Sequence, residues 1–170
     1  MDLKGIFRFV APEIREAAIK AAAQLDHLGI RYALAGGLAV GAHGYVRATT
    51  DVGFLVGEEA FERQGLLVAF KAGVPIEVDG IRIDYLSPLS LGPQLEEVLD
   101  HPPMSEGLAV VPVEALIYLK LVANRRRDLL DVIELVKAGA DVNRARKYLA
   151  QYADDLAPVF EELASEALSE

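Results

Sequence analysis

The hydrophobic positions of the first half of the chain switch between a helical and an extended spacing. From Ala11 to Leu28 apolar residues recur three or four positions apart, which predicts a helix, and His27-Leu28-Gly29 predicts its end. Tyr32 to Ala35 and Val52 to Val56 are short, continuous apolar runs, which predict buried strands. The chain therefore begins as a helix followed by two strands.

The segments around these strands carry turn and helix signals. Gly36-Gly37 follows the first strand, and the next residues, LAVGAHG, predict a short helix closed by Gly44. The pattern from Glu58 to Phe70 predicts another helix. A β-hairpin turning at Asp79-Gly80 is expected from the apolar runs Ile76 to Val78 and Ile81 to Leu86.

The last third of the sequence is helical throughout. Pro112 is well placed at the first position of a helix with the sequence VEALIYLKLVA, and later helices are expected to begin near Asp128, Asp141 and Asp154. The sequence thus predicts an α/β (α+β) core over residues 1–105, with a mixed sheet flanked by helices. A helical C-terminal bundle over residues 106–170 would cap this core.

Composition narrows the class of protein. A chain of 170 residues, 52% hydrophobic, can bury one core, and no apolar run approaches the roughly 20 residues of a membrane span. The charged N-terminus lacks a signal-peptide pattern, so we expect a cytoplasmic protein that does not contact membranes. The absence of cysteine excludes disulfides, cysteine-bound zinc and thiol catalysis, and three histidines do not favour a histidine-rich metal site. Any metal would be bound by carboxylates, which suits Mg²⁺ or Mn²⁺.

The formal net charge of −9 bears on the partners of the protein. Binding along a nucleic-acid backbone requires a surplus of lysine and arginine, so bulk DNA binding is not expected. A small nucleotide remains compatible with the charge, because its phosphates can be met by local groups.

Candidate chemistry lies around the two strands. Gly36-Gly37 between a strand and a helix is a possible phosphate site, although two glycines at such a place are more often a tight turn. Arg47 and Asp51 follow, and Asp84 lies on the strand IRIDYL. Carboxylates on neighbouring strands beside an anion site are what a magnesium-bound triphosphate requires. The alternatives are a strand-end cap or an Arg47 partner for Asp51, and an exposed hairpin position for Asp84.

Three stretches resemble one known superfamily. YALAGGLAVGAHGYVRATTDVGFLV resembles the core of the nucleotidyltransferases, in particular the small bacterial branch of abortive-infection, toxin–antitoxin and aminoglycoside or lincosamide enzymes. IRIDYLSP resembles the strand that carries the third carboxylate of the family. VPVEALIYLKLVANRRRDLLDVIEL resembles its helical segment, so that the resemblance covers roughly residues 30–140.

The resemblance implies an activity and a set of site residues. The activity is transfer of a nucleotidyl group from a nucleoside triphosphate to a hydroxyl of a small molecule, an RNA end or a protein, with Mg²⁺ or Mn²⁺. Asp51 and Asp84 would be the first and third catalytic, metal-binding carboxylates. The residues expected near the nucleotide phosphates are Gly36, Gly37, Arg47 and Lys120.

Gly53 departs from the family pattern, which has a second metal-binding carboxylate there. One explanation is a non-catalytic interaction module that retains the fold, in a toxin–antitoxin system for example, with a protein partner. A second is an active enzyme in which a neighbouring acid substitutes, and the acids available are Glu58, Glu59, Glu77 and Asp79. A third is a glycine introduced into this chain. If Gly53 is not a vacated ligand position, it should be a bulge or a site of close packing.

Other polar residues receive a structural interpretation. The run Arg125-Arg126-Arg127 lies where cations stabilise the C-terminal end of the Pro112 helix. Asp128 and Asp131 are expected to pair with these arginines or to cap the next helix. His43 and His101 have no partner at the spacing of a metal ligand or a general base, so no chemistry is assigned to them.

Overall fold

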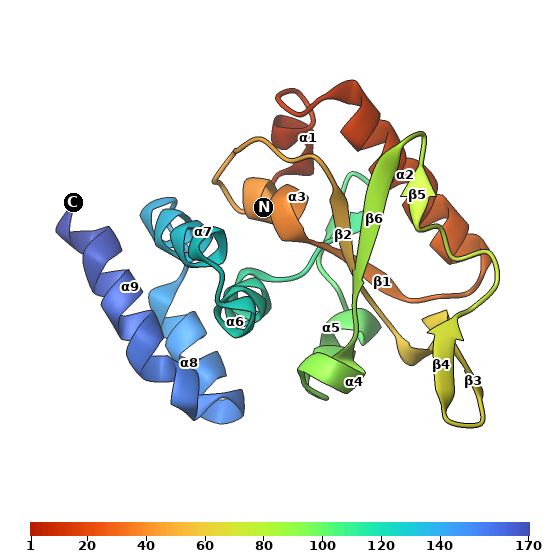
Figure 1. Cartoon of the computed structure of the whole chain (residues 1–170). Coiled ribbons are helices and arrows are strands. Elements are labelled where there is room, and N and C mark those ends of the chain that lie inside the picture. The colour runs from red at the N-terminus through yellow and green to blue at the C-terminus, as the bar shows by residue number, and fades with distance from the viewer.

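The computed structural model describes residues 1–170, and its centre is a four-stranded mixed sheet of order β1-β2-β6-β5 (Figure 1). β1 (Tyr32–Ala35) is antiparallel to β2 (Val52–Val56), β2 is parallel to β6 (Ile81–Leu86), and β6 is antiparallel to β5 (Glu77–Val78). Two further two-stranded ladders join β3 (Phe61–Gln64) to β4 (Leu67–Phe70) and β7 (Met104–Ser105) to β8 (Leu108–Ala109). The predicted strands at 32–35 and 52–56 are confirmed, as is the turn at Asp79-Gly80.

Helices cover the sheet and form the C-terminal part of the chain. Those of the first two thirds are α1 (Leu3–Ile6), α2 (Pro12–His27), α3 (Gly36–Ala42), the 3₁₀ turn η1 (Glu58–Ala60), α4 (Pro88–Leu91) and α5 (Leu95–Asp100). They are followed by α6 (Val113–Ala123), α7 (Arg126–Lys137), α8 (Val142–Tyr152), η2 (Asp154–Leu156) and α9 (Ala157–Ser169). The mixed α/β class and the helical C-terminal part are therefore as predicted.

The helix boundaries follow local signals. α2 has Pro12 in its first turn, and buried residues recur along it at helical spacing. Asp141 is the N-cap of α8, because its side chain accepts a hydrogen bond from the backbone N–H of Arg144. α6 ends at Asn124, whose left-handed backbone (φ 52°) turns the chain into α7.

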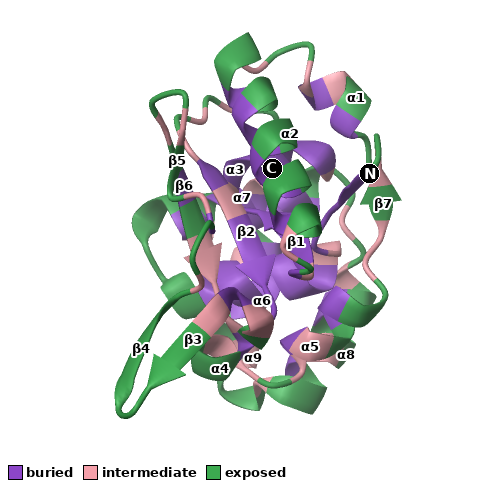
Figure 2. Cartoon of the chain, turned by 90° about the vertical axis from the view of Figure 1, so that its right-hand side faces the viewer, coloured by how far each residue is buried: buried purple, intermediate pink, exposed green.

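The core lies between the sheet and the helices on its two sides. α2 packs against β2 and β6 on one side, while α6 to α9 lie on the other, where α7 packs against α9 and α6 against α8 (Figure 1). The buried residues of β1, β2 and α6 belong to one continuous cluster (Figure 2). Val110 and Val111 run beside Leu34 of β1, so the chain contacts the sheet just before α6 begins. The division of the chain near residue 105 stays a prediction.

The helix predicted over Glu58 to Phe70 is wrong. Only η1 is helical, and the rest is the β3–β4 hairpin, turning at Gly65 with φ 64°. Phe61 and Phe70 lie opposite each other and stack at 5.1 Å between ring centroids, and Phe70 also contacts Tyr85 at 5.2 Å. Phe61 and Phe70 form a cross-strand pair within the hairpin, and the contact of Phe70 with Tyr85 joins the hairpin to β6.

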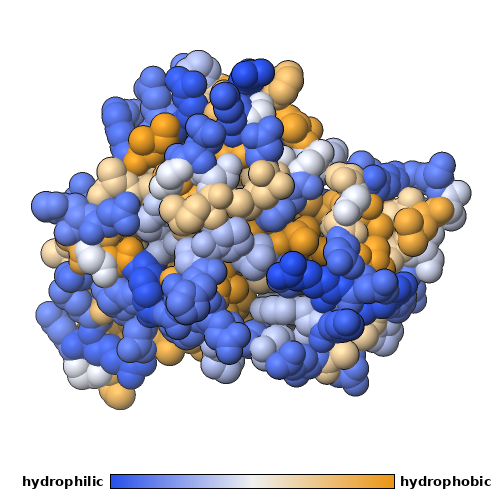
Figure 3. Space-filling model, turned by 180° about the vertical axis from the view of Figure 1, so that it is seen from behind, coloured by the Kyte–Doolittle hydropathy of each residue, from blue (hydrophilic) through white to orange (hydrophobic).

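The surface is mostly polar. Hydrophilic side chains cover much of the face seen from behind, with hydrophobic atoms in separate patches (Figure 3). The β3–β4 hairpin is exposed along most of its length (Figure 2), and Leu66 and Leu67 at its tip are 102% and 75% exposed. None of the helices combines the length and the apolar composition that crossing a membrane requires.

Candidate functional site

The two glycines after β1 have different surroundings. Gly36 has φ 64°, and a side chain there would point over Gly53, whose Cα and N lie 3.8 Å from the position of a Cβ. Gly37 is buried, and a Cβ there would collide with Thr49, at 2.6 Å from its Oγ1. Gly36 therefore borders the open space beside β2, whereas Gly37 allows the loop after α3 to pass closely over the start of that helix.

Asp51 and Asp84 are brought together by the parallel pairing of β2 and β6. The Nη2 group of Arg82 donates to Oδ2 of Asp51 at 3.0 Å and to Oδ2 of Asp84 at 3.1 Å. One guanidinium nitrogen thus holds both carboxylates on the same face of the sheet. The two acids share one site, and their role as catalytic metal ligands stays a prediction.

Gly53 lies between the Gly36-Gly37 turn and Asp84. In the sheet it is opposite Ala35 on one side and Asp84 on the other, with continuous pairing and no bulge. A Cβ at position 53 would be 3.7 Å from its nearest neighbours, which are atoms of Ala35 and Gly36 at ordinary van der Waals distance. Neither a bulge nor close packing requires this glycine, and the Cβ of a larger residue would fit there.

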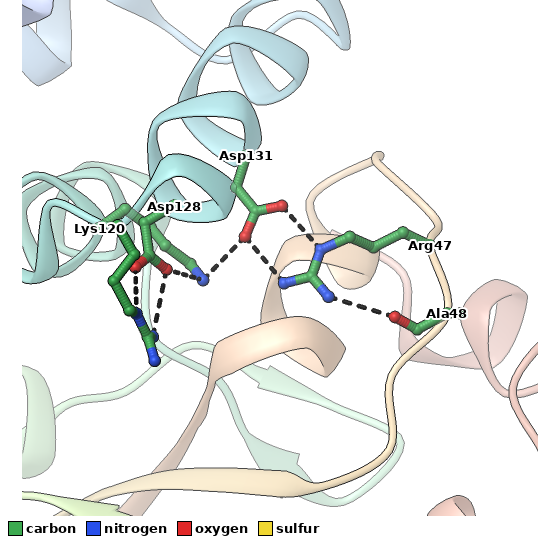
Figure 4. A network of polar contacts seen from close by, with 6 residues as sticks. Arg47, Ala48, Lys120, Asp128 and Asp131 are labelled. Carbon is green, nitrogen blue, oxygen red and sulfur yellow. Dashed lines mark hydrogen bonds and ion pairs between the residues drawn. The ribbon is translucent and has the colours of Figure 1, made fainter.

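Arg47 and Lys120 are engaged in a buried ion-pair network with two aspartates of α7 (Figure 4). Arg47 binds Asp131 through both ends of its guanidinium group, Nε to Oδ1 at 2.7 Å and Nη2 to Oδ2 at 2.8 Å. The Lys120 ammonium lies 2.8 Å from Asp131 and 2.9 Å from Asp128. Arg125 is the last member of the network, and its Nε lies 2.7 Å from Oδ2 of Asp128.

Burial and charge both act on this network. The side chains of Asp131 and Asp128 are 1% and 2% exposed, and those of Lys120 and Arg47 are 8% and 14% exposed. Burial opposes the ionisation of Asp128, but the hydrogen bonds from Arg125 and Lys120 outweigh it, so the pKa of Asp128 lies below its ordinary value. Arg47 and Lys120 are both directed at aspartates. Their expected positions near the nucleotide phosphates stay predictions.

Arg125 is the most exposed cation of the network. Its side chain is 77% exposed, and the hydrogen bond to Asp128 is the main cause of its raised pKa. Asp51 and Asp84 add to that shift in pKa through space, so Arg125 lies within electrostatic reach of both acids. The site therefore has carboxylates on the sheet and a solvent-accessible guanidinium at the start of α7.

A cavity of about 240 Å³ lies between the glycine turn and α6. Its walls are largely apolar, with Gly36, Lys120, Arg125 and Asp128 as the polar or backbone contributions. The volume is below the roughly 300–1,000 Å³ typical of complete ligand sites. It can therefore enclose only a small, largely apolar group.

The residues present do not fit the metal site that the family resemblance implies. The structure contains no group of three or more histidine, cysteine, aspartate or glutamate side chains that could hold a metal ion. Of the acids considered as substitutes, Glu59 binds Arg31 at 2.8 Å and Asp79 binds Lys20 at 2.5 Å. Asp51 and Asp84 remain as a pair, with Arg82 between them.

His43 has a structural contact at the end of α3. Its Nε2–H donates to the carbonyl oxygen of Val111 at 2.7 Å, which links α3 to the segment that leads into α6. Burial lowers the pKa of His43 below 6.5, and the Val111 carbonyl only partly offsets this effect.

His43 binds a proton more readily in the unfolded chain than in the folded protein, because its pKa is lower in the folded state. The free energy of unfolding should therefore decrease as the pH falls below 6.5, until the folded-state pKa of His43 is reached. Above that window His43 is neutral in both states and contributes no slope. Urea unfolding as a function of pH should show a shallower decrease for His43→Gln than for the wild type. Identical pH profiles for the two proteins would contradict the assignment.

Two residues of the site, Arg82 and Arg125, were not identified from the sequence as site residues. Arg82 precedes Asp84 by two positions on the same strand, so the extended period places both on one face, a signal the sequence does contain. The position of Arg125 depends on the turn at Asn124 and on pairing with Asp128, which bring it to the site from a distant part of the chain.

Comparisons with known proteins find similarity in structure only. No protein-family model matches the sequence, and no curated protein matches it significantly. Among solved structures the chain is similar to an antigenic nucleotidyltransferase-like protein from Paracoccidioides brasiliensis, with 16% sequence identity and a TM-score of 0.47. The match covers 89% of this chain and 93% of that one. A function for this chain must therefore be argued from its own residues.

Proposed function

We propose that this chain is a nucleotidyltransferase-like protein that binds a nucleoside triphosphate at the site formed by Gly36, Asp51, Asp84 and Arg125. The observation that carries the proposal is an apolar cavity lined by Gly36 of the glycine turn and by the exposed Arg125, next to the strands that carry the Asp51–Asp84 pair. A nucleotide offers matching parts, because its base and sugar are partly apolar and its phosphates need cationic or N–H donors.

Each side chain has a distinct role in this proposal. The cavity beside α6 would receive the base or the sugar, while Gly36 lets the backbone at the start of α3 approach the phosphates without a side chain between them. Arg125 is exposed enough to reach a phosphate from the opposite side. Arg47 would support the site by holding the loop after α3 against α7, and Lys120 by holding α6 against α7.

Transfer of the nucleotidyl group to a hydroxyl does not follow from this geometry. The carboxylates present do not make up a set that could hold two metal ions. A non-catalytic interaction role is the alternative, and the surface that favours it is the exposed apolar β3–β4 hairpin.

Titration of the protein with ATP, GTP, CTP and UTP, with Mg²⁺ and with chelator, tests the proposal by calorimetry. Saturable binding of at least one nucleotide is expected. Absence of binding for all four would refute the nucleotide site and support the interaction role.

Gly36→Val should weaken nucleotide binding by about tenfold or more, since its side chain would lie over Gly53 where the phosphates are expected. The variant also places a β-branched residue at positive φ, a strain of about 1–3 kcal/mol. Gly29→Val is a matched control, because Gly29 has φ 70° and no neighbouring atom within 4 Å of a Cβ. Equal nucleotide affinity of both variants would contradict the role of Gly36.

A further inference from the structure

The position of Arg82 is set by the strand pairing. β2 and β6 pair in parallel with Val52 opposite Ile83, so the preceding residues, Asp51 and Arg82, lie side by side. Asp84 is two residues beyond Arg82 and opposite Gly53, on the same face. Ile83, between Arg82 and Asp84, is buried and fixes which face of β6 points inward. Arg82 and Asp84 therefore both lie on the opposite face, next to Asp51.

Arg82 lies between the two acids and offsets part of their mutual repulsion, while its 71% exposed side chain leaves these contacts screened by water. Its Nη2 group lies 3.0 Å from Oδ2 of Asp51 and 3.1 Å from Oδ2 of Asp84, so one positive charge faces both carboxylates. Without a cation, two carboxylates that converge on one point would repel each other. In many carboxylate sites a divalent metal ion reduces this repulsion, whereas here the Arg82 side chain reduces it.

A metal ion and Arg82 would compete for the same oxygens. Mg²⁺ binds carboxylate oxygens at about 2.0–2.1 Å in a nearly ideal octahedron and gives up its water reluctantly. To bind both acids through the Oδ2 atoms that Arg82 contacts, it would have to displace the guanidinium from both. With glycine at position 53, no third carboxylate is present to offset that loss.

We propose that Arg82 is a built-in substitute for a divalent cation, which closes the Asp51–Asp84 site to metal ions. Its guanidinium occupies the point where the two carboxylates converge, and Gly53 removes the third ligand that would favour a metal over it. The inference rests on the proposed function only in one respect, which is that the nucleotide is then bound by the protein without a protein-held metal.

The test compares four proteins: the wild type, Gly53→Asp, Arg82→Gln and the double variant. Melting temperatures are measured with and without Mn²⁺, and Mn²⁺ binding is measured directly by calorimetry. The wild type should show no saturable binding. The double variant should bind Mn²⁺, and its melting temperature should rise by about 5–10 °C when the metal is at about a hundred times its Kd.

The single variants separate the two contributions. Gly53→Asp should respond to Mn²⁺ less than the double variant, because Arg82 still competes for the carboxylates. Arg146→Gln is the control for loss of an arginine, since Arg146 pairs with Glu161 at 2.6 Å on a distant, exposed surface, and it should behave as the wild type. The proposal is overturned if the wild type binds Mn²⁺ as tightly as the double variant, or if the folded double variant does not bind it.

These measurements use the metal alone, so they stand whether or not a nucleotide binds. The nucleotide titration of the wild type, repeated in chelator, tests the link between the two proposals. Equal affinity with and without Mg²⁺ supports binding without a protein-held metal. Binding that requires Mg²⁺ would contradict this link and leave the nucleotide site intact, while the measurements with Mn²⁺ alone decide the proposal for Arg82.

Discussion

Asp131→Asn is expected to lower the free energy of unfolding by about 3–5 kcal/mol. Asp131 is almost fully buried, and it binds two cations, Arg47 and Lys120, that are themselves shielded from water. Asparagine has nearly the same shape but no charge, so the variant leaves buried positive charge with one aspartate, Asp128, in place of two. The cost comes mainly from desolvated charge that has lost its partner.

The consequence should extend beyond global stability. Arg47 lies in the loop over Gly37, and Asp131 is on α7, so their contact joins the loop after α3 to the C-terminal helices. Loss of the contact should loosen this loop and the neighbouring start of α3. Hydrogen exchange of the backbone amides around Arg47 should therefore be faster in the variant.

Urea unfolding measures how much the free energy of unfolding decreases in Asp131→Asn. An m-value equal to that of the wild type checks that both proteins unfold in the same two-state manner. Asp79→Asn is the matched control, because Asp79 also forms an ion pair, with Lys20, but both side chains are more than half exposed. Asparagine also tolerates the positive φ of 50° at that position. Little change is expected there. Similar unfolding midpoints for the two variants would show that the buried network does not stabilise the fold as described.

Phe54→Ala should cost about 3–5 kcal/mol of stability. The Phe54 ring is completely buried in the middle of β2, in edge-to-face contact with Tyr32 at 5.5 Å and stacked on Tyr85 at 6.2 Å between ring centroids. Truncation removes these contacts and leaves a cavity that three strands cannot close without moving. The ring is on the face opposite Gly53, so it holds the strand that carries the acidic site.

The control for this substitution is Phe9→Ala, because Phe9 is 75% exposed. A change within about 0.5 kcal/mol is expected for a surface position of this kind. Comparison of the two urea midpoints separates the effect of burial from that of losing an aromatic ring. A small effect of Phe54→Ala would mean that the β2 core is able to repack around the missing ring.

The two proposals for the site fit a single physical account. Gly53 has room for a side chain, so its lack of a carboxylate is a chemical difference rather than a packing requirement. Arg82 then satisfies the two acids that remain, and Arg125 is left exposed to meet an anion. Such a site would retain the means to bind a nucleotide without retaining a set of carboxylates for metal ions.

The sequence by itself determined the elements whose signals are local. The continuous apolar runs at 32–35 and 52–56 became strands with those bounds, the spacing over residues 12–27 became α2, and Asp141 caps α8. Each depends on neighbours within a few positions, such as a side chain and the backbone N–H three residues later. The order of Asp51 and Asp84 on successive strands was also sufficient to expect them at one place.

The segment from Glu58 to Phe70 shows where local signals fail. Its apolar residues are compatible with both the helical spacing and the alternation of a strand. The hairpin is determined by contacts with residues far away in the sequence. Phe70 packs against Tyr85, and Gly65 provides a turn with positive φ. Tertiary packing therefore overrode a helical preference that is worth only tenths of a kcal/mol per residue.

Only the tertiary structure decided what each charge does. Arg47 and Asp131 are 84 positions apart, and their pairing depends on how α7 packs beside the loop after α3. Arg82 and Asp84 are close in sequence, but the contact with Asp51 requires the parallel register of β2 and β6. A sequence shows which residues can carry charge, but desolvation and distance determine which charges pair and which remain free, and both are set by the fold.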